Sequence, residues 1–71
     1  MALKIDRYDI PRSEWERIIH EWIFNERHRA ILCERLFDGY TYEELAERHG
    51  LSVQQIKTIV YRAMAKIEKH I

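Results

Sequence analysis

The sequence predicts an all-α protein, a small four-helix domain whose last two helices form a helix-turn-helix. Apolar residues recur at the helical period, most clearly in segments 13–24 and 53–69. Ser or Thr is followed three residues later by Glu or Gln at three predicted helix starts, which is the capping-box pattern. The single proline, Pro11, precedes the first of these segments and cannot lie in a helix interior.

The size and composition bound the possible classes of protein. A chain of 71 residues allows one small domain with a marginal hydrophobic core. No apolar run is long enough to span a membrane, and the first residues lack the layout of a secretory signal. The lone cysteine, Cys33, cannot form an internal disulfide, which agrees with a reducing, cytoplasmic location.

Residues 1–12 have no clear apolar period, so we expect an N-terminal arm that packs on the core, with Pro11 marking the boundary. Lys4 and Arg7 offer phosphate contacts, but two aspartates in the same stretch weaken that attraction. Residues 13–71 then form the helix-turn-helix domain.

The first helix is expected from Ser13 to about Phe24, with Glu16 completing a capping box. One face of this helix carries two tryptophans and three isoleucines, which we interpret mainly as core. Aromatic residues are also enriched at interfaces, so the alternative is a surface for a partner or a second copy. The residues of that candidate interface are Trp15, Ile18, Trp22 and Ile23.

The second helix is expected from an N-cap at Asn25 to about Phe37, closed by Asp38 and Gly39. Cys33 is most simply a small buried hydrophobe on this helix. Neighbouring positions on a helix point in different directions, so the sequence predicts no metal site here.

The third helix should begin after a Thr41–Glu44 capping box and run from Tyr42 to about Arg48. Gly50 can adopt the positive φ that ends a helix tightly. The first helix of a helix-turn-helix crosses the DNA backbone, so Arg48 and the adjacent histidine either approach a phosphate or form a solvated helix end.

The fourth helix, 53–69, starts after a Ser52–Gln55 capping box and is the expected recognition helix for the major groove. On its outward side, Gln54 can pair with adenine and Lys57 with guanine, while Val53 and Thr58 offer methyl groups to thymine. Other residues are better placed for phosphates. The full predicted DNA-binding set is Ser52, Val53, Gln54, Gln55, Lys57, Thr58, Tyr61, Arg62 and Lys66.

The distribution of charge supports this assignment. The chain has no net charge, but residues 51–71 carry four Lys or Arg against one Glu, so residues 1–50 carry the matching negative excess. A basic helix can simply complement its own dipole at its C-terminal end. Lys57 and Arg62 lie well before the last turn, which favours DNA binding.

From Asn25 to Ile67 the sequence NERHRAILCERLFDGYTYEELAERHGLSVQQIKTIVYRAMAKI resembles region 4 of sigma-70-type factors, most specifically in GYTYEELAERHGLS. The resemblance implies a helix-turn-helix that reads promoter DNA and docks on RNA polymerase. It implies base contacts from Val53, Gln54, Lys57 and Thr58, with Gln55 and Arg62 near phosphates. Many principal sigma factors have a basic residue where this chain has Val53, so the preferred DNA sequence does not transfer.

We therefore expect a sequence-specific regulator of transcription from a bacterium, phage or mobile element, with double-stranded DNA as its partner. Sigma factors use a further domain to melt the promoter, so we do not expect these 71 residues alone to be a complete sigma factor. Weak binding by one helix predicts help from RNA polymerase or a second copy. The alternative is a module that binds RNA polymerase or an anti-sigma partner without reading DNA. No phosphate loop, nucleophile–base pair or ligand cluster indicates an enzyme, a cofactor or a metal.

Overall fold

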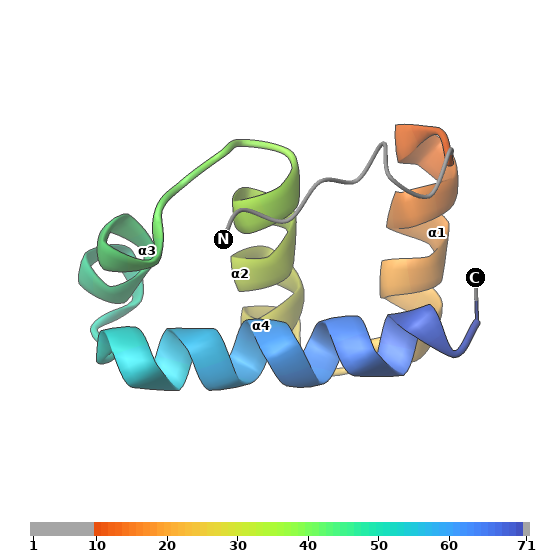
Figure 1. Cartoon of the computed structure of the whole chain (residues 1–71). Helices are drawn as coiled ribbons and strands as arrows, with labels where there is room; N and C mark the ends of the chain where they lie inside the picture. The colour runs from red at the N-terminus through yellow and green to blue at the C-terminus, as the bar shows by residue number, and fades with distance from the viewer. Residues whose placement is uncertain (1–9, 71) are drawn as a thin grey trace.

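The computed structural model describes residues 10–70, and in this part of the chain it has four helices and no strand. These are α1 (Arg12–Trp22), α2 (Glu26–Leu36), α3 (Tyr42–His49) and α4 (Val53–Glu68). In Figure 1, α4 lies along one side, α1 and α2 stand against it, and α3 packs near its start. The predicted four-helix fold is confirmed.

Helix α4 contacts each of the other three helices, so its apolar stripe forms the centre of the core. The stripe repeats every three or four residues, which is the spacing that keeps side chains on one helix face. Burying a large apolar side chain contributes about 1.5–3 kcal/mol. The largest fully buried side chains are Trp15, Ile19, Ile31, Leu32, Leu45, Ile56, Val60 and Ile67.

The apolar face of α1 belongs to this core, which corrects the expected partner interface. The exposed fractions of Trp15, Ile18 and Ile23 are 0%, 4% and 5%, so none of them offers a surface to a partner of the folded domain. Trp22 is half-buried, and its ring stacks on the His70 imidazole with 3.6 Å between centroids. Periodicity identified the apolar face, but the face is covered from within the chain.

The start of α1 also differs from its prediction. The helix begins at Arg12, after Pro11, and no side chain caps it, so the expected Ser13–Glu16 capping box is absent. Ser13 is already inside the first turn, where it cannot act as the N-cap. Glu16 instead forms an ion pair with Arg12 at 3.0 Å. The predicted arm therefore ends before residue 12, and its residues 1–9, with Lys4 and Arg7, lie outside the described part.

The junction between α1 and α2 is fixed by a side chain from α2. Helix α1 ends at Trp22 rather than Phe24, because Ile23 takes an extended conformation. The Arg29 guanidinium donates to the backbone carbonyls of His20, at 2.9 Å, and of Ile23. These carbonyls have no partner within their own helix end, so Arg29 both caps α1 and sets the angle to α2.

Helix α2 starts as predicted, because the Asn25 side chain accepts a hydrogen bond from the backbone N–H of His28 at 3.1 Å. It ends at Leu36, and the following turn passes through Gly39 with a φ of 74°. Cys33 is half-buried beside the core, and burial raises the pKa of its thiol. No helix within residues 10–70 has the length and apolar character needed to cross a membrane.

Candidate nucleic-acid interface

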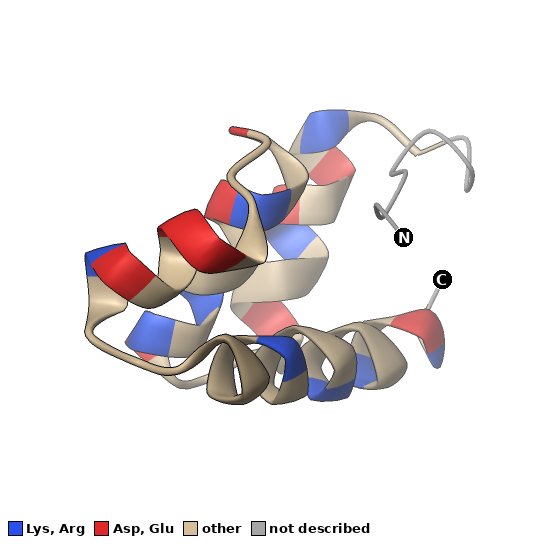
Figure 2. Ribbon diagram, turned by 60° about the vertical axis from the view of Figure 1, so that its left-hand side comes forward, with Lys and Arg blue, Asp and Glu red and all other residues tan. Residues whose placement is uncertain are grey.

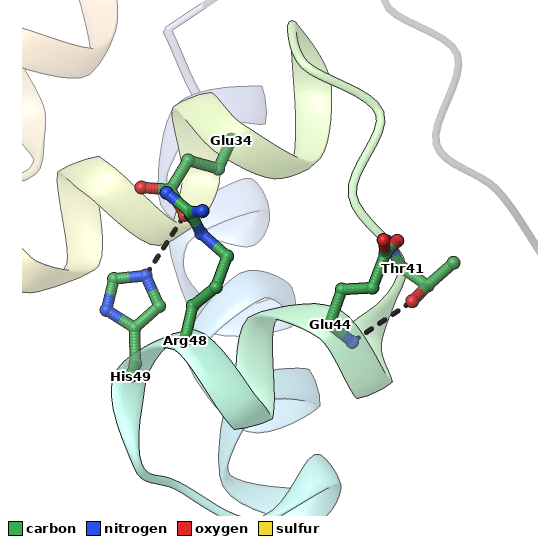
Figure 3. Close-up of polar contacts among 5 residues, drawn as sticks. All are labelled: Glu34, Thr41, Glu44, Arg48 and His49. Atoms are coloured by element: carbon green, nitrogen blue, oxygen red, sulfur yellow. Dashed lines mark hydrogen bonds and ion pairs between the residues drawn. The ribbon is translucent and has the colours of Figure 1, made fainter.

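Helices α3 and α4 and the turn between them form the predicted helix-turn-helix. The Thr41 hydroxyl accepts from the Glu44 N–H at 3.1 Å, and the Glu44 carboxylate accepts from the Thr41 N–H at 2.8 Å (Figure 3). The backbone bond from Thr41 is the main reason that the pKa of Glu44 lies below its ordinary value. Gly50 has the expected positive φ, 66°, and Leu51 N–H donates to the Ala46 carbonyl, which closes the turn.

The end of α3 is held against α2 by a shared carboxylate. Glu34 Oε1 lies 3.1 Å from Arg48 Nε and 3.1 Å from His49 Nε2, and Figure 3 shows both side chains directed at it. Burial raises the pKa of Glu34, but the hydrogen bonds from His49 and Arg48 outweigh it, so the pKa falls below its ordinary value. Arg48 and His49 thus help to position α3 against α2, whichever of the two predicted roles they have at its end.

The start of α4 has the second predicted capping box. Ser52 Oγ accepts from the Gln55 N–H at 3.1 Å, and Gln55 Oε1 accepts from the Ser52 N–H at 2.9 Å. Both residues were predicted to contact DNA. The structure uses these two oxygens to satisfy backbone donors, so their first role is to define where α4 begins.

The outward face of α4 carries the other predicted DNA-binding residues. Gln54, Arg62 and Lys66 are exposed, whereas Val53 and Thr58 are partly buried. The Thr58 hydroxyl donates to the backbone carbonyl of Gln54 at 3.0 Å. These side chains all belong to α4, and Gln54, Thr58 and Arg62 follow one another at four-residue spacing along one of its faces.

The side chains of Lys57 and Tyr61 both lie near the ring of Tyr42, the first residue of α3. The Lys57 ammonium lies 5.7 Å from the centroid of the Tyr42 ring, and the Tyr61 ring meets the same ring edge-on at 6.3 Å. Tyr42 is buried and has the Arg35 guanidinium over its ring at 4.3 Å. Tyr61 itself is 53% exposed. The start of α3 therefore positions one side of the recognition helix.

Among the described residues, the cations of α4 have neither a carboxylate nor a backbone carbonyl as partner. Those of α1 and Arg48 pair with carboxylates, and the arginines of α2 donate to backbone carbonyls. Figure 2 shows a row of blue segments along α4 with a red segment only at its far end, whereas the other helices carry both blue and red segments. Within residues 10–70, no Asp or Glu lies within ion-pair distance of Lys57, Arg62 or Lys66. Lys57 lies on the side of α4 near α3 and Lys66 on the side near Phe24, and unpaired cations at such positions are suited to contact phosphates.

One surface residue was missed by the sequence analysis. Phe24, in the connection between α1 and α2, is 71% exposed, and the Lys66 ammonium lies 5.2 Å above its ring. Beside it is a hollow of about 250 Å³, lined by Ile23, Phe24, Asn25, His28, Thr58, Ile59, Arg62, Ala63 and Lys66. From the sequence, Phe24 is expected only as the approximate end of the first helix, with no role assigned to it, and no helical period could reveal its exposure.

Within residues 10–70, no group of three or more His, Cys, Asp or Glu residues could hold a metal ion. The model of one protein family, Sigma-70, region 4, matches residues 24–69, which is more than half of the chain. Comparisons with curated proteins and with solved structures gave no match.

Proposed function

Because this chain belongs to the Sigma-70, region 4 family of DNA-binding helix-turn-helix domains, we propose that it regulates transcription by reading a specific duplex sequence. Helix α4 enters the major groove, and double-stranded DNA in the cytoplasm is its ligand. Val53, Gln54, Lys57 and Thr58 face base edges. The flanking residues Tyr61, Arg62 and Lys66 contact phosphates.

The observation that carries this proposal is the set of unpaired cations on α4. A cation that is already paired with a carboxylate brings that negative charge toward the DNA phosphates. Lys57, Arg62 and Lys66 have no such partner among the described residues, so phosphates can neutralise them and release condensed counterions. This release is the main source of sequence-independent affinity.

Three cations give only weak binding at physiological salt, so we propose that stable occupancy of DNA requires a second copy or RNA polymerase. The α1 face cannot supply that contact, because Trp15, Ile18 and Ile23 are buried. Phe24 is the large apolar side chain left most exposed among residues 10–70, and its surroundings offer an alternative contact surface.

The test measures fluorescence anisotropy of a labelled random duplex pool over a salt series. We expect the slope of log K against log salt to be smaller by about 2 in the Lys57→Ala, Arg62→Ala variant, because each lost phosphate contact removes about 0.9. The matched control, Arg12→Ala with Arg17→Ala, also removes two positive charges, but these are paired with glutamates in α1. We expect this control to retain the salt slope of the wild type.

Equal loss of binding in the two variants would show that only net charge matters, which contradicts a specific DNA face on α4. Absence of wild-type binding even at low salt would favour the second candidate function, an interaction module that binds RNA polymerase or an anti-sigma partner. The exposed Phe24 is the observation that favours this candidate. Its test is a pull-down of RNA polymerase, which Phe24→Ala should weaken and Lys57→Ala, away from the hollow beside Phe24, should not.

A further inference from the structure

Thr58 lies in the N-terminal half of α4, between the base-facing residue Gln54 and the cation Arg62 along the same helix face. Its hydroxyl donates its only proton to the Gln54 carbonyl, with 3.0 Å between the oxygens. This bond to the carbonyl four residues earlier is a conformation that threonine commonly adopts in helices. The oxygen is thus held against the helix backbone, and the γ-methyl is the other group on the same β-carbon.

The major groove presents different groups on each base, and the hydrogen bond restricts which of them Thr58 can recognise. Guanine O6 and N7, adenine N7 and thymine O4 all require a donor, and the Thr58 proton is already donated. The remaining candidates are the amino groups of adenine and cytosine, which the hydroxyl lone pairs can accept, and the C5-methyl group of thymine, which the γ-methyl can contact. The oxygen's place against the backbone favours the methyl contact.

We propose that Thr58 recognises a C5-methyl group in the major groove through its own γ-methyl. This inference rests on the proposed function, because it concerns the same face of α4. Thymine carries such a methyl group, and 5-methylcytosine carries one at the equivalent ring position. Binding by this protein therefore responds to cytosine methylation wherever a cytosine faces Thr58.

The neighbouring residues support a methyl-reading surface at this point of the helix. Ser52 and Gln55 use their oxygens in the capping box, which reduces the polar groups left for bases near the helix start. Val53 is partly buried and apolar, and it starts the same helix. Gln54 is the exposed amide in this set and the residue best suited to pair with adenine.

The experiment uses the duplex that the wild-type protein selects from a random pool. Each thymine is replaced in turn by deoxyuridine, which lacks only the C5-methyl, and affinities are measured for the wild type, Thr58→Ser and Thr58→Val. Ser keeps the hydroxyl and removes the methyl, whereas Val keeps the methyl and removes the hydroxyl. The three residues have similar helix propensities, and circular dichroism checks that both variants fold.

We expect deoxyuridine at one position to weaken wild-type binding about fourfold, the factor for one buried methyl group. Thr58→Ser should weaken binding to the thymine duplex equally and should be insensitive to deoxyuridine at that position. Thr58→Val should bind like the wild type. A duplex with cytosine at the same position should bind more weakly than the thymine duplex. A duplex with 5-methylcytosine there should bind about fourfold more tightly than the cytosine duplex.

Loss of binding in Thr58→Val with full binding in Thr58→Ser would overturn the proposal, because the hydroxyl would then be the reader. Independent, additive effects of Thr58→Ser and deoxyuridine at every position would overturn it too, since the two methyl groups would not be in contact. Either result leaves the proposed function intact. A wild type that selects no duplex removes the proposed function itself, together with this inference.

Discussion

Helices α1 and α4 both bury an apolar face and expose a charged one, yet they treat their cations in opposite ways. On α1, Arg12 pairs with Glu16, and Arg17 pairs with two glutamates one turn away on either side. On α4, no described carboxylate lies within ion-pair distance of the three cations. One helix neutralises its charge within the fold, and the other leaves it for an external partner.

Pairing, rather than net charge, distinguishes α4 from α1 and supports the proposed DNA-binding surface on α4. The chain has as many acidic as basic residues, so its total charge gives no indication of DNA binding. Exposed ion pairs contribute about 0–1 kcal/mol to stability, so the α1 pairs matter little for folding. They do cancel the attraction between α1 and phosphates. The arginines of α2 also lack a carboxylate partner, but they donate to backbone carbonyls, so among the described helices only α4 has cations with neither kind of partner.

The largest expected effect tests whether α1 serves the core alone. Trp15 is fully buried, and Trp15→Ala should lower the free energy of unfolding by about 3–5 kcal/mol, because it leaves a large cavity. Trp22→Ala on the same helix should cost clearly less, because Trp22 is only half-buried. Urea denaturation followed by circular dichroism measures both. Equal losses would mean that α1 is not packed as described.

A smaller effect is expected at Glu34 of α2, whose carboxylate is paired with Arg48 and His49 of α3. Glu34→Gln should lower the free energy of unfolding by about 1–2 kcal/mol at neutral pH, because it weakens the charge-assisted bonds to Arg48 and His49. The folded pKa of Glu34 lies below its ordinary value of 4.5, so its ionised form stabilises the fold above that pH. This contribution is lost as the pH falls through the folded pKa.

Urea denaturation of the wild type between pH 6 and pH 3 should therefore show stability falling below about pH 4.5, and Glu34→Gln should have a weaker pH dependence. Glu44 also has a lowered pKa, so part of the dependence remains in the variant. Glu47→Gln is the matched control, because Glu47 is exposed on α3 and has no ion pair among the described residues. A variant that keeps the full pH dependence would contradict the role of Glu34.

The smallest effect is expected from a variant in which cations of α4 gain a carboxylate partner, as the cations of α1 have. Ala65 is exposed, three residues after Arg62 and four before Lys69, so Ala65→Glu creates helical ion pairs with both. We expect the salt slope of DNA binding to fall by about 1, because a neutralised cation no longer releases a counterion. Ala65→Gln controls for size and should retain the wild-type slope. An unchanged slope in Ala65→Glu would show that pairing does not govern binding.

Local signals in the sequence predicted most of the fold. Asn25, Thr41 with Glu44, and Ser52 with Gln55 all cap helices as expected, because each cap joins residues only three positions apart. The Ser13–Glu16 pattern failed because Pro11 starts the helix one residue earlier than expected and so places Ser13 within it. A capping pattern is thus decisive only when its first residue lies outside the helix.

Contacts between distant parts of the chain could not be predicted in the same way. The Glu34 contacts with Arg48 and His49 join α2 to α3 across more than ten residues, and no spacing rule covers such pairs. The apolar stripe on α1 was visible, but a stripe does not say whether a helix of the same chain covers it. On α4 the residues of the face were predicted, whereas the use of the Thr58 hydroxyl within the helix required coordinates.

The two reciprocal capping boxes have a consequence for the speed of DNA association. Each box satisfies backbone N–H groups at a helix N-terminus with hydrogen bonds inside four consecutive residues. The N-termini of α3 and α4 are therefore ordered before any ligand binds. Little conformational entropy is then lost on docking. Encounter, accelerated by the field of the α4 cations, should limit the association rate, and differences between DNA sequences should be expressed in the dissociation rate.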